Sequence, residues 1–195
     1  MLNHLLTLDR HLLLAANHAH GPVLDAVMVF ASERLVWFPV YGLLIAWLIY
    51  TFRRRAALLL PVLVLAVALA DSITSRIFKP YFARPRPCHD EAVAPLLYLP
   101  WGCGGQFGFL SSHAANSTAL AVFLLLALPA GRYRALKVGG FLWAGLLSYS
   151  RIYLGAHYPT DVLGGAAVGA LLGAGAALAF RKLAPRIDSI TQKAA

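Results

Sequence analysis

The 195-residue chain is strongly apolar: 59% of its residues are hydrophobic, 13% are charged, and the formal net charge is +9. This composition excludes disordered chains, collagen-like repeats and coiled coils, because the first have low hydrophobicity and the others need regularly spaced polar positions. The basic residues stand in short clusters at the ends of apolar segments, which argues against a nucleic-acid partner. We therefore expect a single integral membrane domain, residues 1–195, embedded in the lipid bilayer.

The first 31 residues mix apolar and polar positions. Residues 2–16 are largely apolar and are interrupted by Asp9, Arg10 and His11, and a polar stretch from His18 to Asp25 follows. This pattern is too polar for a membrane span and is typical of an amphipathic helix that lies on a membrane surface. We expect residues 1–31 to form an interfacial segment, with a surface helix over residues 2–16 and a short, partly inserted helix over 23–31.

Five apolar stretches follow and predict an all-α bundle of about five transmembrane helices. They cover residues 35–52, 56–78, 114–130, 138–150 and 162–180. The main basic clusters follow the first, third and fifth stretches: Arg53, Arg54 and Arg55; Arg132, Arg134 and Lys137; Arg181, Lys182, Arg186 and Lys193. Since basic clusters mark the cytoplasmic side, the linkers 79–113 and 151–161 are predicted to meet on the outer face.

Residues inside the predicted spans indicate how the helices pack. Gly165, Gly169 and Gly173 recur every four residues, so they share one helix face and permit close packing within the bundle. Asp71 would cost about 2.5–3.5 kcal/mol if it faced lipid at the bilayer centre. We therefore expect it to pair with Arg76 or with a hydroxyl group.

The outer linkers concentrate residue types that bind phosphate. Ser111 and Ser112 stand directly before an apolar helix, where free backbone N–H groups and the helix dipole favour an anion. Arginine forks match phosphate oxygens, and lysine adds a positive charge. Four such cations lie in these linkers: Lys79, Arg84, Arg86 and Arg151. The predicted ligand of this face is an anionic phosphate group.

Two histidines in the same linkers fit a nucleophile and an acid–base partner. Imidazole changes protonation near neutral pH and attacks phosphorus when it is neutral. Asp161 stands four residues after His157 and could accept a hydrogen bond from its ring, while His113 follows Ser112. Both histidines sit among cations rather than carboxylates, so no metal site is expected there.

These residues form three ordered motifs: Lys79 with Arg86-Pro87 after six residues; Ser111-Ser112-His113; and Ser150-Arg151 with His157 and Asp161 behind them. The arrangement resembles the signature of the PAP2 (type 2 phosphatidic acid phosphatase) superfamily. That superfamily includes membrane lipid phosphatases and, more distantly, vanadium-dependent haloperoxidases. The resemblance covers residues 79–161 closely and implies a PAP2/haloperoxidase-like helical core.

The resemblance also implies roles for individual residues. His157 would attack phosphorus and form a phosphohistidine, with Asp161 orienting its ring, and His113 would protonate the leaving oxygen and later activate water. The phosphate oxygens would be bound by Lys79, Arg86, Arg151, Ser111 and Ser112. The middle motif departs from the common Pro-Ser-Gly-His form, since Leu110 and Ser112 replace the proline and the glycine. Arg84 is either another phosphate ligand or an interfacial side chain.

Cys88 and Cys103 are the two cysteines of the chain, and both fall in the outer active-site loop 79–113. An outward-facing loop lies in an oxidising compartment, where disulfides persist. We expect a disulfide that closes this loop and adds about 3 kcal/mol of stability.

The sequence therefore predicts a lipid phosphatase that needs no metal or cofactor, in a bacterial inner (cytoplasmic) membrane with its active site facing the periplasm or the outside. Similarity to bacterial undecaprenyl diphosphate phosphatases favours undecaprenyl diphosphate as the substrate. Phosphatidylglycerol phosphate, phosphatidic acid and lipid A 1-phosphate are the alternatives, as is transfer of phosphate to another lipid. A lipid-phosphate binder or transporter would need the cations but not the His157 and Asp161 pair, and about five spans disfavour a soluble vanadate enzyme.

Overall fold

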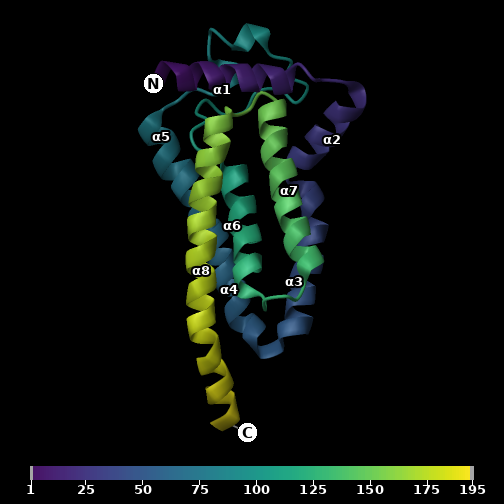
Figure 1. Cartoon of the computed structure of the whole chain (residues 1–195), viewed down its shortest axis with the longest axis vertical. Helices are drawn as coiled ribbons and strands as arrows, with labels where there is room; N and C mark the ends of the chain where they lie inside the picture. Colours follow the sequence, from purple (N-terminus) through teal and green to yellow (C-terminus); the bar gives the residue numbers. More distant parts are fainter. Residues whose placement is uncertain (1, 194–195) are drawn as a thin grey trace.

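The computed structural model describes residues 2–193, and side chains over residues 4–185. Over this range the regular elements are helices and no β-strand forms, which confirms the predicted all-α fold. Long helices run side by side along the molecule (Figure 1): α3 (Phe38–Phe52), α4 (Ala56–Ser72), α6 (Ser112–Ala127), α7 (Arg134–Tyr153) and α8 (Pro159–Lys193).

The sides of this bundle, which face away from its core, are apolar. Large side chains point away from the core on several helices, among them Leu43, Leu65, Leu142, Leu163, Leu171 and Leu178. Such a surface suits the hydrocarbon core of a bilayer, and the chain is an integral membrane protein. Leu35–Phe82 and Pro159–Pro185 are long and apolar enough to cross a membrane, whereas α6 is apolar but shorter. The number of spans stays a prediction.

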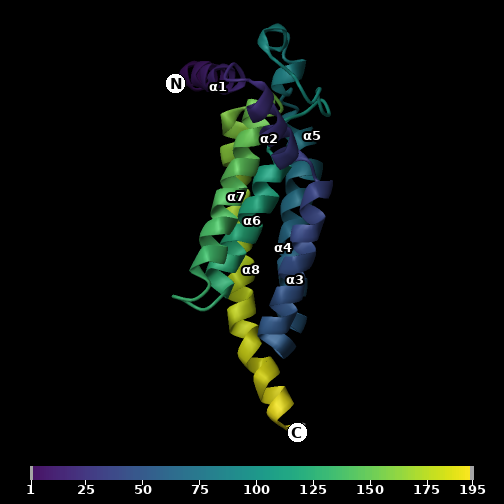
Figure 2. The ribbon, with the colours of Figure 1, turned by 90° about the vertical axis from the view of Figure 1, so that its right-hand side faces the viewer.

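The segment Leu35–Phe82 contains two antiparallel helices. After α3 the chain reverses at Arg53, whose φ is +49°, and Arg53–Arg55 form one 3₁₀ turn. α4 then continues through a π-helical stretch, Ile73–Phe78, into the short α5 (Lys79–Phe82). Figure 2 shows α3 and α4 together on one side of the bundle. The unbroken helix brings Lys79 to the outer end, and such π-helical stretches often occur near functional sites.

The predicted basic clusters lie away from the outer end of the bundle, where Lys79 is found. The α3–α4 turn and the connection between α6 and α7 are at the end of the bundle opposite α1 (Leu2–Asn17) (Figure 1). Arg53–Arg55 and Arg132 belong to these two connections. The side chains of Arg186 and Lys193, which complete the third predicted cluster, lie outside the described residues. These basic residues therefore lie at the end that the positive-inside rule assigns to the cytoplasm, and the orientation stays a prediction.

α6 and α8 pack through the predicted glycine face. A Cβ atom on Gly165, Gly169 or Gly173 would lie under 3.0 Å from a backbone carbonyl oxygen of α6 or its cap. Those carbonyls belong to Ser111, Ala115 and Ala119, which also recur every four residues. The two backbones therefore approach each other as closely as only glycine allows. This contact fixes the first turn of α8 beside the first turn of α6.

The N-terminal helices cover the outer end. α1 lies across that end of the bundle, and α2 (Pro22–Ser32) runs from it toward α7 (Figure 1). Both helices match the predicted ranges. Asn17, fully buried at the end of α1, donates from its amide to the carbonyl oxygens of Tyr98 and Tyr153, both at 2.7 Å. Hydrogen bonds therefore attach α1 to both the outer loop and the end of α7.

The outer loop folds back on itself between α5 and α6. The N–H of Arg86 donates to Gln106 O at 2.9 Å, and the N–H of Gly108 donates to Arg84 O at 2.9 Å. Cys88 and Cys103 are joined by a disulfide, with their Cα atoms 5.9 Å apart. These cross-links hold the arginines of the first motif above the ends of the helices.

Candidate active site

The three motifs converge at the outer end of the bundle. Lys79 Nζ donates to Ser112 Oγ at 3.2 Å, which joins the first motif to the second. The N–H of Ser111 donates to the carbonyl oxygen of Asp161 at 2.9 Å, which joins the second motif to the third. The positive charges of Arg86, Arg151 and Lys79 all act on His157. Residues far apart in the sequence therefore form one site.

His157 and Asp161 lie in and just after the turn between α7 and α8. The His157 side chain is 1% exposed, and its Nδ1 is 3.6 Å from Asp161 Oδ2. This separation is longer than a hydrogen bond, and such contacts commonly tighten when substrate binds. Asp161 Oδ2 also accepts from the N–H of Tyr158 at 3.0 Å, so the carboxylate is fixed against the turn that carries His157. Since Nδ1 faces Asp161, Nε2 is the nitrogen left for a substrate.

The surroundings of His157 keep its imidazole neutral. Burial, followed by the charges of Arg86, Arg151 and Lys79, holds the pKa of His157 well below its usual value. A neutral imidazole has a free lone pair and can act as a nucleophile. The same cations that disfavour a proton on the ring would attract a phosphate group to it.

The middle motif begins α6. Ser111 Oγ accepts from the N–H of Ala114 at 3.5 Å, so its hydroxyl caps the helix, and its own N–H is used by Asp161. His113 Nε2 is buried and has no hydrogen-bond partner among the described residues. Ser112, which replaces the glycine of the common motif, also hydrogen-bonds Thr74 Oγ1 at 2.9 Å. Its hydroxyl therefore orients Lys79, a function that glycine could not supply.

Arg86 and Arg151, two of the expected phosphate ligands, lie at the convergence of the motifs. Arg86 Nε donates to Phe107 O at 3.3 Å, and Gly104 leaves room for its guanidinium, since a Cβ there would lie 2.7 Å from Arg86 Nη1. Arg151 is 3% exposed, and its Nη1 donates to Ser32 Oγ at 3.0 Å. Arg151 Nε is buried and finds no hydrogen-bond partner in the part of the chain that the structure describes. Both side chains are held in place while donors remain for an anion.

Arg84 is bound by two carboxylates at the outer end of the bundle. Its Nη1 donates to Asp161 Oδ1 and to Thr160 Oγ1, both at 2.7 Å, and its Nη2 donates to Asp9 Oδ2 at 2.7 Å. The guanidinium also lies 4.2 Å from the ring centroid of Tyr158. Both terminal nitrogens therefore donate to other residues of the protein, and a contact between Arg84 and phosphate stays a prediction. It holds Asp161 from the side opposite His157.

Three further residues of the site come from the N-terminal quarter of the chain, where we expected only membrane contacts. Asp9 is 3% exposed on α1 and binds Arg84, and Ser32 is 1% exposed on α2 and binds Arg151. Arg34 follows α2 and lowers the pKa of Arg86, although burial is the larger cause. A buried polar residue on an amphipathic helix is a weak signal, because the local sequence does not show that the helix covers a site.

A largely apolar cavity of about 570 Å³ opens beside His113, between α3, α4, α6 and α7. Its polar end contains Arg34, Ser112 and His113. Asp71 lines the same cavity and accepts from Asn116 Nδ2 at 3.1 Å. Asp71 therefore pairs with an amide on α6, and the expected pairing with Arg76 or a hydroxyl group is replaced. The cavity therefore joins an apolar interior to the end of the bundle where the three motifs meet.

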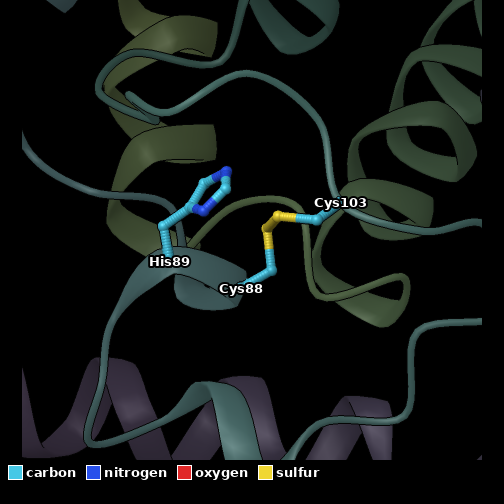
Figure 3. A group of neighbouring side chains, drawn as sticks. All are labelled: Cys88, His89 and Cys103. Carbon is cyan, nitrogen blue, oxygen red and sulfur yellow. A yellow bond between two sulfur atoms is a disulfide. The ribbon is translucent and has the colours of Figure 1, made fainter.

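One group of possible metal ligands lies in the outer loop. The ligand atoms of Cys88, His89 and Cys103 are within 4.8 Å of one another (Figure 3). The two sulfur atoms are bonded to each other, and a His89 ring nitrogen lies 3.0 Å from Gly104 O. A thiolate is the form of cysteine that binds metals, so the intact disulfide leaves only the imidazole. This group fits a structural loop closure.

Comparison with known proteins agrees with the geometry. Residues 58–185 match the PAP2 superfamily. The chain is 37% identical over 98% of its length to a lipid A 4'-phosphatase of Bacteroides thetaiotaomicron, covering 85% of that protein. It is 28% identical over 79% of its length to undecaprenyl-diphosphatase BcrC of Bacillus subtilis, covering 74% of that protein.

A solved structure shows the same architecture. The transmembrane PAP2-type phosphatidylglycerolphosphate phosphatase of Bacillus subtilis aligns with a TM-score of 0.67 at 25% identity, over 92% of this chain and 87% of that one. Together with the convergence of the three motifs, these similarities show that the chain belongs to the PAP2 superfamily and is a membrane phosphatase that acts on lipid phosphates.

Proposed function

We propose that the protein hydrolyses the 4'-phosphate of lipid A through a phosphohistidine on His157. The observation that carries the mechanism is a buried, neutral imidazole between Asp161 and the cations of the phosphate-binding motifs. The 37% identity to a lipid A 4'-phosphatase over 98% of the chain supports this substrate over the undecaprenyl diphosphate that the motifs alone favoured.

The first step transfers the phosphoryl group to the enzyme. His157 Nε2 attacks phosphorus, a P–N bond forms, and the bond from phosphorus to the lipid oxygen breaks. Lys79, Arg86 and Arg151 bind the phosphoryl oxygens and stabilise their charge, and Asp161 stabilises the positive imidazole that forms. His113 protonates the departing lipid oxygen, since the anionic phosphate group beside it lets its ring hold a proton.

The second step returns the enzyme to its starting form. His113, now neutral, removes a proton from water, and the water oxygen attacks phosphorus. The P–N bond breaks, inorganic phosphate leaves, and His157 becomes neutral again. No metal is required, because the arginines and the lysine supply the positive charge.

We further propose that the site faces the periplasm or the outside from a bacterial inner membrane. The separation of Arg53–Arg55 and Arg132 from the catalytic end supports this orientation. The substrate headgroup would then reach His157 from the outer leaflet, while its chains stay in the bilayer or enter the cavity beside His113.

The test is phosphate release by the purified protein in detergent with a chelator present. Bis-phosphorylated lipid A, undecaprenyl diphosphate, phosphatidylglycerol phosphate and phosphatidic acid are compared by kcat/KM, and mass spectrometry locates the phosphate lost from lipid A. We expect lipid A to give the highest value, with loss at the 4' position, and His157→Ala to release none. Absence of release from every lipid would contradict the proposal of an enzyme.

Undecaprenyl diphosphate is the second candidate. The similarity to BcrC over 79% of the chain favours it, and the same two steps apply with a lipid phosphate as the leaving group. A higher kcat/KM for undecaprenyl diphosphate than for lipid A would select this substrate. Adding a second lipid as acceptor shows whether phosphate is transferred to a lipid and not only to water.

A further inference from the structure

α1 contributes a buried carboxylate to the catalytic end. Asp9 Oδ1 accepts from the N–H of Thr160 at 2.9 Å, and its Oδ2 accepts from Arg84 Nη2 at 2.7 Å and from Thr160 Oγ1 at 2.5 Å. Thr160 is the second residue of α8. Asp9, which lies on α1, therefore caps the first turn of α8, and this same turn carries Asp161. Asp9 lies outside the residues 58–185 that match the family.

Arg84 connects Asp9 with Asp161. One nitrogen of its fork binds Asp9 Oδ2 and the other binds Asp161 Oδ1, both at 2.7 Å. Because the guanidinium is planar and rigid, the position of Asp9 determines the direction from which Nη1 approaches Asp161. The other oxygen of Asp161 is the one that faces His157 Nδ1 at 3.6 Å. A line of contacts thus runs from α1 to the proposed nucleophile.

The charges along this line also matter. Asp9, Arg84 and Asp161 together carry one net negative charge, whereas Arg84 and Asp161 alone would be neutral. With Asp9 present, the positive charge of Arg84 is shared between two carboxylates. Asp161 therefore keeps more of its negative charge for the imidazole, which becomes positive when it attacks phosphorus.

The neighbouring residue of α1 supports the same turn. Arg10 Nη2 lies 3.4 Å from Asp90 Oδ2, and the hydroxyl of Tyr158 donates to that oxygen at 2.7 Å. The Arg10 pair is exposed and contributes little energy on its own. It nevertheless links α1, through Asp90, to Tyr158, the residue that follows His157.

We propose that Asp9 is a positioning residue for catalysis: through Arg84 it holds Asp161 in the place and charge state that orient and stabilise His157. This inference rests on the proposed phosphohistidine mechanism. It assigns α1 a function in the reaction in addition to its place at the membrane surface. Asp9 does not touch the substrate, so its effect falls on kcat and not on substrate binding.

The test compares Asp9→Asn, Asp9→Glu and the control Asp25→Asn. Asp25 is a matched aspartate at the same end of the molecule, and it accepts from the Tyr153 hydroxyl at 2.5 Å. We expect Asp9→Asn to lower kcat about 10-fold, which is ~1.4 kcal/mol of activation free energy, with KM changed by less than about 2-fold. Asp25→Asn should leave both constants unchanged. Asp9→Glu should retain a higher kcat than Asp9→Asn. Asparagine is closer to aspartate in size, but glutamate keeps the negative charge that binds Arg84.

A double-mutant cycle separates positioning from a merely structural cap. In an Arg84→Met background, Asp9→Asn should lower kcat by less than about 2-fold further, because the effect passes through Arg84. The same 10-fold loss in both backgrounds would overturn the proposal, as would an unchanged kcat in Asp9→Asn. If Asp9→Asn does not fold, Asp9→Glu replaces it. Its effect on kcat is then compared between the wild-type and Arg84→Met backgrounds, and an equal loss in both would overturn the proposal.

The proposed function and this inference fail in different ways. If the wild-type protein releases phosphate from a lipid but Asp9→Asn has the wild-type kcat, only the inference is wrong. If the wild-type protein releases phosphate from no lipid while it is folded and monodisperse, the proposed function is wrong, and the inference falls with it.

Discussion

The two halves of the bundle are built by different interactions. In the inner half, large apolar side chains such as Leu48, Leu59, Phe123 and Phe180 pack together. In the outer half, small apolar clusters are accompanied by many buried polar or charged side chains, including Asp9, Asn17, Ser32, Arg151, His157 and Asp161. Packing can tolerate small shifts, whereas the outer half depends on directed hydrogen bonds between distant segments. Stability and chemistry should therefore respond to different substitutions.

The largest expected effect is on chemistry. Asp161→Asn should lower kcat by about 10⁴-fold, the loss seen when the orienting carboxylate of a catalytic histidine is neutralised. The single amide oxygen can accept from the N–H of Tyr158 or from Arg84 but not from both, so we expect a modest fall in the melting temperature beside the large loss of kcat. Kinetics on the best lipid and thermal unfolding in detergent measure the two effects. A kcat within 10-fold of the wild-type value would contradict the proposal that Asp161 orients and stabilises His157.

A substitution at the α6–α8 contact should affect the fold first. Leucine at Gly169 would place atoms against the backbone of Ala115, which cannot move away as a flexible side chain could. We expect Gly169→Leu to cost more than about 3 kcal/mol and to lower the yield of monodisperse protein. Gly175→Leu is the matched control, because a Cβ there meets nothing within 4 Å. Equal melting temperatures for the two variants would contradict the close helix contact.

A substitution in the outer loop should affect both activity and local stability. Cys88→Ser with Cys103→Ser opens a disulfide whose partners are 15 residues apart, at a cost of about 3 kcal/mol in the loop-entropy description. The loop carries Arg84 and Arg86, so we expect activity to fall with temperature earlier than the helical signal does. Circular dichroism and phosphate release, measured over one temperature range, would show it. Loss of both signals at one temperature would mean that the loop and the bundle unfold together.

The smallest expected effect concerns pH. Burial, followed by nearby cations, holds the pKa of His157 well below its usual value of about 6.5. As the pH falls through about 6.5, the unfolded chain binds a proton at this position and the folded protein does not, so protons favour unfolding. The wild type should therefore lose stability between pH 7 and pH 5 relative to His157→Gln, by at most about 1.4 kcal/mol per pH unit. Parallel melting curves for the two proteins would contradict a neutral His157.

The sequence predicts the local parts of this structure well. The ranges of the long helices follow from apolar stretches between basic clusters, and the glycine spacing predicts the tight contact of α8. Serines before an apolar run predict the start of α6, where Ser111 caps the helix. Each of these features depends on residues within a few turns of one another, so local spacing contains the information.

The sequence does not predict which distant residues meet. Asp9, Ser32 and Arg34 lie in segments with no recognisable motif, and they join the site only because α1 and α2 fold over the outer end. Arg84 was expected to face phosphate or the interface, but two carboxylates from different helices bind it. Helices with apolar faces on several sides can pack in more than one order, so spacing along the chain does not fix these contacts.

Trapping the phosphorylated enzyme tests the central claim most directly. Radiolabelled lipid phosphate is mixed with the protein, turnover is stopped with alkali within milliseconds, and the labelled peptide is identified by mass spectrometry. We predict a phosphohistidine that is stable in alkali and labile in acid, located at His157 and absent from His157→Gln. Label on another residue, or continued turnover by His157→Gln, would contradict the proposed role of His157.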